Sequence, residues 1–214
     1  MMSDAEFNAG LDACVDWVQF VLSQHNTKDL TPVVVAHTYT KRTHQGAGRV
    51  APESMILVLH NYSSDHHQAI LMEVGKLLAH QEKAPIATYF ICEAWTTAED
   101  DLDDVGQRIE KYKRLENDPD REEAIYIVGK SYDGRNNAAQ VRIGRAADGT
   151  MRALDTLFFR LGASMKIPGG ADLCTDIYRG FSMGILARQI EALGHSDRHQ
   201  AGHDRTEKGG AKWN

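Results

Sequence analysis

Residues 55–97 decide the fold, and they read MILVLHNYSSDHHQAILMEVGKLLAHQEKAPIATYFICEAWTT. The five apolar residues 55–59 are typical of a buried strand. Ser63 or Ser64 then caps a helix, which ends before Pro85. The inner face of that helix carries apolar residues at helical spacing, namely Ile70, Val74, Leu77 and Leu78. Residues 86–97 form a second strand, rich in aromatic and branched side chains.

A strand, a helix and a strand joined by short links predict a βαβ unit. The helix carries the chain back along the sheet, so we expect the two strands to be parallel. Before this unit, residues 3–24 predict a helix that begins with a capping box formed by Ser3 and Glu6. Residues 33–35 predict a short strand, followed by an exposed loop.

After the βαβ unit, the pattern is that of a β-hairpin. Residues 124–128 and 139–145 predict two strands, with turn residues Asp-Gly at 133–134 and again at 148–149. Hairpin strands are antiparallel, so the sheet is predicted to be mixed.

The C-terminal region is predicted to be a helix over about residues 171–193, with Gly194 as its C-cap. Its one apolar face carries Leu173, Ile177, Phe181, Ile185 and Leu193. Residues 195–214 are polar and rich in histidine, and we expect a flexible tail there. The 214 residues, 42% of them hydrophobic, suffice for one well-packed domain. We therefore predict a single α+β domain over residues 1–194, in which N-terminal, central and C-terminal helices pack a mixed sheet.

The sequence gives no sign of secretion or of membrane insertion. It holds no run of about 18 apolar residues, and it starts with the acidic, polar MMSDAEF. We expect a cytoplasmic protein with no membrane partner. Cys14, Cys92 and Cys174 are far apart and lie in apolar surroundings, which favours buried free thiols over disulfides or a zinc site.

The net charge of −6 is concentrated in one segment. Residues 97–123 contain eleven acids and five bases, whereas residues 130–166 contain seven bases and three acids. An acidic loop beside a basic hairpin favours pairing within the chain or between copies of a homo-oligomer. The loop acids assigned to assembly are Glu99, Asp100, Asp101, Asp103 and Asp104. Chelation of Ca²⁺ or Mg²⁺ by these acids is an alternative, although the EF-hand spacing is absent.

One candidate catalytic set lies where the first strand of the βαβ unit meets its helix. His60, Asp65 and His66 follow that strand, at the edge where open sheets bind ligands. With Glu93 they would hold a divalent metal or act as general acid and base. In the alternative interpretation Asp65 complements the helix dipole and the histidines are solvated, because no HExxH or CxxC motif supports a site.

Glu93 interrupts an otherwise apolar strand and therefore requires a partner. Desolvation would raise its pKa and suit it to acid or base chemistry. A structural ion pair with an arginine is the other interpretation, and the nearby candidates are Arg121, Arg142 and Arg145. Separately, Lys41, Arg42 and Arg49 in the segment YTKRTHQGAGR are candidate anion contacts, although the segment is no P-loop.

A pattern of three parts resembles uncharacterised small proteins of bacteria and their phages. Its parts are Glu93-Ala94-Trp95, an acidic insertion, and the motif DPDREE at 118–123 leading into a strand and a DG turn. The similarity covers about residues 86–150. It implies a strand pair joined by a variable acidic loop, with Arg121 as counter-ion of Glu93, and it brings no activity or cofactor.

Three functions stay open on this basis. The leading hypothesis is a non-catalytic binding or assembly protein of phage or mobile-element type, acting as a homo-oligomer or with a protein partner and without a cofactor. One alternative is a metal-assisted hydrolase that uses His60, Asp65, His66 and Glu93. The other is a nucleic-acid accessory factor that uses Lys41, Arg42, Arg49 and the basic hairpin.

Overall fold

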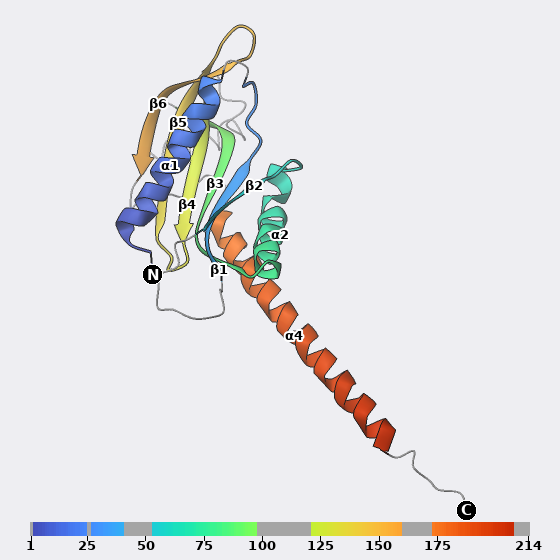
Figure 1. Cartoon of the computed structure of the whole chain (residues 1–214). Helices are drawn as coiled ribbons and strands as arrows, with labels where there is room; N and C mark the ends of the chain where they lie inside the picture. Colours follow the sequence, from blue (N-terminus) through green and yellow to red (C-terminus); the bar gives the residue numbers. More distant parts are fainter. Residues whose placement is uncertain (1, 25–26, 41–52, 98–120, 160–172, 208–214) are drawn as a thin grey trace, which may run out of the picture.

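The computed structural model describes residues 2–24, 27–40, 53–97, 121–159 and 173–207. Within them, six strands form one sheet in the order β2-β1-β3-β4-β5-β6 (Figure 1). The strands are β1 (Val33–Thr40), β2 (Glu53–Val58), β3 (Lys83–Thr97), β4 (Arg121–Ser131), β5 (Asn136–Arg145) and β6 (Met151–Phe159). The helices are α1 (Asp4–Ser23), α2 (His67–His80), which the 3₁₀ turn η1 (Ser64–His66) precedes, and α4 (Leu173–Glu207).

The predicted α+β class is confirmed, but every neighbouring strand pair is antiparallel, so the sheet is not mixed. β2 and β3 do run in the same direction. They are not neighbours, because β1 lies between them: Val33 pairs with Val58 on one side and with Ile91 on the other. The predicted βαβ unit is therefore split by an inserted strand. Periodicity finds strands, but it carries no information about which strand lies beside which.

The α1 capping box and the two Asp-Gly turns are confirmed, whereas the predicted Ser63 or Ser64 cap is wrong, because Ser63 makes no capping hydrogen bond and α2 begins at His67. Ser3 and Glu6 form the capping box at the start of α1, with Glu6 N donating to Ser3 Oγ over 3.2 Å. Gly134 and Gly149 have φ angles of 90° and 85° at the β4–β5 and β5–β6 turns, a conformation that glycine adopts without strain.

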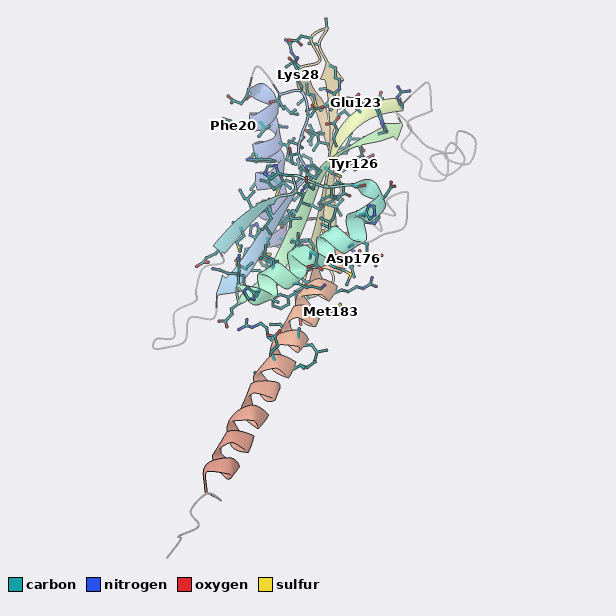
Figure 2. The ribbon with its side chains drawn as sticks, turned by 90° about the vertical axis from the view of Figure 1, so that its right-hand side faces the viewer. Phe20, Lys28, Glu123, Tyr126, Asp176 and Met183 are labelled. Atoms are coloured by element: carbon teal, nitrogen blue, oxygen red, sulfur yellow. The ribbon has the colours of Figure 1, made fainter. Side chains whose placement is uncertain are left out.

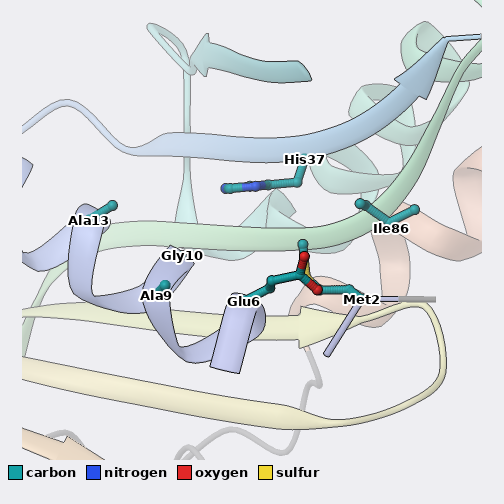
Figure 3. A pocket seen from close by; sticks show the side chains of 7 residues that line it. All are labelled: Met2, Glu6, Ala9, Gly10, Ala13, His37 and Ile86. Atoms are coloured by element: carbon teal, nitrogen blue, oxygen red, sulfur yellow. The ribbon is translucent and has the colours of Figure 1, made fainter. Parts of the chain in front are cut away.

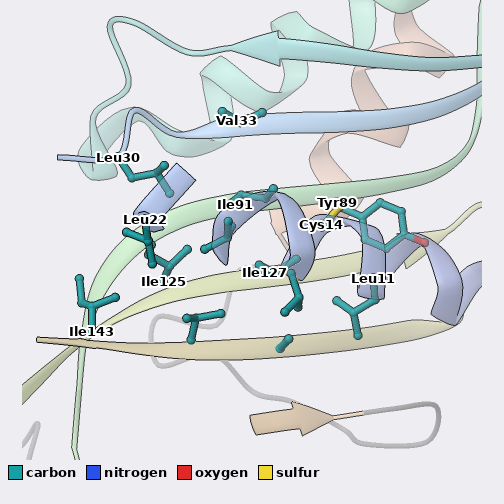
Figure 4. Packing of buried hydrophobic residues seen from close by; sticks show 14 of the residues in the cluster. Leu11, Cys14, Leu22, Leu30, Val33, Tyr89, Ile91, Ile125, Ile127 and Ile143 are labelled. Atoms are coloured by element: carbon teal, nitrogen blue, oxygen red, sulfur yellow. The ribbon is translucent and has the colours of Figure 1, made fainter. Parts of the chain in front are cut away.

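Helices cover both faces of the sheet. α1 packs over β3 to β6, and its core side chains include Leu11, Tyr89 and Ile127 (Figure 4). α2 and α4 pack on the opposite face, around Phe90 and Ile177. Consecutive β3 residues alternate between the two cores, as the two-residue period of a strand requires.

The prediction that the last helix stops at Gly194 is wrong, because α4 continues to Glu207. Near its start α4 crosses α2 closely. Arg188 then donates to the Ala79 carbonyl over 2.9 Å and to Glu82 Oε1 over 2.5 Å. Beyond that point α4 extends away from the rest of the chain (Figure 1). Among the described residues, no helix is long and apolar enough to cross a membrane.

Candidate assembly surface

The predicted catalytic set is not brought together. His60, Asp65 and His66 are exposed. Asp65 and His66 lie in η1, which leads into α2, and α2 packs on the face of the sheet opposite α1 (the α2 face). Glu93 pairs with Ile125 in the sheet register and so points to the opposite face, where α1 lies. Over the described parts of the chain, no group of three or more His, Cys, Asp or Glu side chains is placed to hold a metal ion.

The arginine partner of Glu93 is Arg145, one of the three candidates, and the specific prediction of Arg121 is wrong. Arg145 Nη2 donates to Glu93 Oε1 over 2.5 Å, while Arg145 Nε donates to Glu123 over the same distance. Arg121 instead lies over the Trp95 ring, 4.7 Å from its centroid. The register explains the difference: Arg121 pairs with Thr97, four residues along β3 from Glu93, which is about 13 Å.

Charge pairs connect the start of β4, the end of β5 and the first half of β6 around a pocket of about 470 Å³. Arg142 binds both oxygens of Asp155, over 2.6 and 2.7 Å, and donates to Glu122 over 3.0 Å. These bonds lower the pKa of the Asp155 carboxyl. Because Arg142 and Arg145 are both engaged by carboxylates, the basic hairpin offers less free positive charge than its sequence suggests.

Other sequence candidates lie outside the described residues. These are the acidic loop residues Glu99, Asp100, Asp101, Asp103 and Asp104, and the anion-contact residues Lys41, Arg42 and Arg49.

A row of exposed apolar side chains lies on α4. Met183, Leu186 and Ile190 are 50%, 57% and 61% exposed, and their spacing of three and four residues places them on one face of the helix. We call these three residues the α4 stripe. Ile177 and Gly180 face the sheet and α2 from the other side of the helix. Figure 2 shows Met183 where α4 leaves the body of the protein.

A second exposed apolar surface lies on the α1 face, over β1 and β2. Here Ile56 is 59% exposed and Val58 is 47% exposed. Beside them, a groove of about 260 Å³ runs between α1 and the sheet (Figure 3). The residues that line the groove include Ala9, Gly10 and Ala13 of α1, His37 of β1 and Ile86 of β3. We call the groove, together with Ile56 and Val58, the β1–β2 groove.

His37 adds no charge to this surface at neutral pH. Burial lowers the pKa of its imidazole below the ordinary 6.5. The ring packs edge-on to Tyr89, with 5.5 Å between centroids. His37 therefore leaves the Glu6 side chain as the charged group among the described residues that line the groove, and the other lining residues are apolar or small.

The sequence interpretation missed the α4 stripe. It assigned one apolar face to the last helix, through Ile177, Phe181 and Ile185. A second apolar row at 183, 186 and 190 was visible in the same segment. A helix that is apolar on two faces signals two packing partners, and α2 accounts for one of them.

No family model, curated protein or solved structure matches this chain.

Proposed function

We propose that this chain is a non-catalytic binding protein that works by assembling with further copies of itself. The observation that carries the proposal is the α4 stripe, three large apolar side chains exposed on a helix that leaves the body. Burying such a side chain contributes about 1.5–3 kcal/mol, so a row of three favours association.

The two alternatives have less support in the described geometry. The metal-assisted hydrolase needs Glu93 in one site with His60, Asp65 and His66, and the sheet separates Glu93 from η1. For a nucleic-acid accessory factor, Arg142 and Arg145 of the hairpin are already bound to carboxylates. An origin in a phage or mobile element stays a prediction from the sequence resemblance.

Sedimentation velocity over a range of protein concentrations tests the proposal. We expect the mass to rise above the 23.8 kDa of one chain as concentration increases. Leu186→Glu places a charge in the stripe and should weaken association at least about tenfold. Ala192→Glu adds the same charge at an exposed site on another face of α4, so it serves as the matched control. A monomer at every concentration would rule the proposal out.

A further inference from the structure

Two of the exposed apolar surfaces differ in curvature, one being convex and the other concave. The α4 stripe is a convex ridge on a helix, with side chains three and four residues apart. The β1–β2 groove is concave, with the sheet as its floor and α1 as one wall. Because a convex ridge of side chains can pack into a concave groove, we consider the two surfaces as partners.

On the α1 face, no helix of the described residues covers β1 and β2. Among the described residues, the opposite face of the sheet carries two helices, α2 and α4, whereas this face carries α1 over β3 to β6. Neighbouring strands lie about 4.8 Å apart, so β1 and β2 together present about 10 Å, the width of one helix. An apolar helix beside α1 would cover Ile56 and Val58.

The wall of the groove suits close helix packing. Four α1 residues line it, Glu6, Ala9, Gly10 and Ala13. The missing side chain of Gly10 leaves room for Tyr89, whereas the small side chains of Ala9 and Ala13 let a second helix axis approach closely. The same device operates inside the chain, where Gly75 of α2 and Gly180 of α4 lie against each other's helix backbone.

The position of α4 points to a second copy as the occupant. The sheet separates the stripe from the groove of the same chain, because α4 packs on the α2 face. However, the two surfaces reach the same end of the body. α4 leaves the body beside Glu82, which immediately precedes β3 (Figure 1). At the same end of the body, the groove is lined by Met2 and Glu6, near the start of α1 (Figure 3).

We infer that the α4 stripe of one copy docks in the β1–β2 groove of a second copy, and that the exchange is reciprocal. The inference rests on the proposed function and names the surfaces through which it acts. Two copies related by a two-fold axis then make the contact twice. Making the contact twice doubles the buried area. This matters because the area of three side chains alone falls short of the roughly 800 Å² that each partner buries in a stable interface.

Mixed cysteine variants test the pairing. Ile56→Cys labels the groove and Ile190→Cys labels the stripe, and both native side chains are exposed. The two purified full-length variants are mixed and treated with a short thiol cross-linker. We expect a covalent dimer in the mixture and little in either variant alone. Wild type gives the background of the native thiols, of which Cys14 and Cys174 are buried.

The control replaces Ile190→Cys with Ala192→Cys, an exposed site on another face of α4. Its mixture with Ile56→Cys should give at least about tenfold less covalent dimer. Ile56→Glu should also weaken self-association as strongly as Leu186→Glu, with an unchanged thermal midpoint.

Other results would overturn the inference. A strong covalent dimer of Ile190→Cys alone would show that two α4 helices pair with each other. An associating wild type whose mixed variants do not cross-link would place the interface elsewhere. Both outcomes leave the proposed self-association standing, whereas a wild type that stays monomeric removes the proposed function and the inference together.

Discussion

A single phenol fixes α1 on the sheet. Tyr89 is fully buried, and its hydroxyl donates to the Phe7 carbonyl over 2.6 Å. Asn137 Nδ2 donates to the same carbonyl over 3.3 Å. Glycines leave room for the ring, since a Cβ at Gly10 would lie 2.3 Å from the Tyr89 hydroxyl and one at Gly129 2.7 Å from Cε1. Burial raises the pKa of the phenol, so it stays a neutral donor.

Tyr89→Phe should therefore lower the free energy of unfolding by about 1–2 kcal/mol. The loss is moderate because Asn137 still donates to the Phe7 carbonyl. Urea denaturation followed by fluorescence gives the value. Tyr132→Phe is the matched control, since Tyr132 is 72% exposed and its change should stay within about 0.5 kcal/mol. Equal stability of the two variants would contradict the assigned role of the Tyr89 hydroxyl.

Some residue contacts could be predicted from the sequence, but only in part. A carboxylate in an apolar strand must be paired, so an arginine partner for Glu93 was predictable. Which arginine it is depends on strand register. Arg121 is nearer in sequence, but Arg145 comes from the end of β5 to bind Glu93 and Glu123 together. Register follows from the whole sheet, and no local pattern contains it.

At the scale of elements, the crossing of α2 and α4 sets the direction in which the α4 stripe points. A Cβ at Gly75 would lie 2.0 Å from the Ile177 carbonyl oxygen, and one at Gly180 would lie 2.0 Å from that of Met72. The two backbones are thus in direct contact. With that face of α4 held against α2, Met183 and Leu186 lie on the exposed side.

Gly180→Ala should separate the two helices and lower the free energy of unfolding by about 1–3 kcal/mol. The added methyl meets backbone, which cannot move aside as a flexible side chain would. Helix propensity offsets about 1 kcal/mol of this loss, so the measured value is a net effect. Ser182→Ala, two residues along at an exposed position, is the control and should change stability little. A Gly180→Ala protein as stable as wild type would show that the crossing is not tight.

The elements themselves were largely predictable, and their arrangement was not. Apolar periodicity located α1, α2 and the strands of the hairpin, because each buries one face. The insertion of β1 between β2 and β3 could not be found in this way, since it depends on long-range pairing. Gly194 also misled the prediction: one glycine lowers helix stability by about 1 kcal/mol, which does not by itself end a helix.

At the scale of the whole molecule, the described helices cover the two faces of the sheet unequally, and α4 extends past the body. Arg188 ties α4 to the end of α2 through Ala79 and to Glu82. Residues 189–207 continue as helix beyond this tie. Gly194 and Gly202 each lower helix stability by about 1 kcal/mol, so this segment is a weak helix unless tertiary contacts support it. Docking of Ile190 on a second copy would supply such contacts at the start of this segment.

A chain that ends after Arg188 tests whether self-association depends on residues 189–207. The body should keep its fold and thermal midpoint, because every α4 contact with α2 and Glu82 described above is retained. Self-association should weaken at least about tenfold, since Ile190 is lost from the stripe. A chain that lacks only residues 208–214 is the control and should associate as the full chain does.

Helix content links the association to the projecting part of α4. If a second copy stabilises residues 189–207, dilution of the full chain should reduce its ellipticity at 222 nm as the assembly dissociates. The chain ending at Arg188 should show no such change with concentration. Full-length ellipticity that stays constant through dissociation would mean that the end of α4 is helical without a partner.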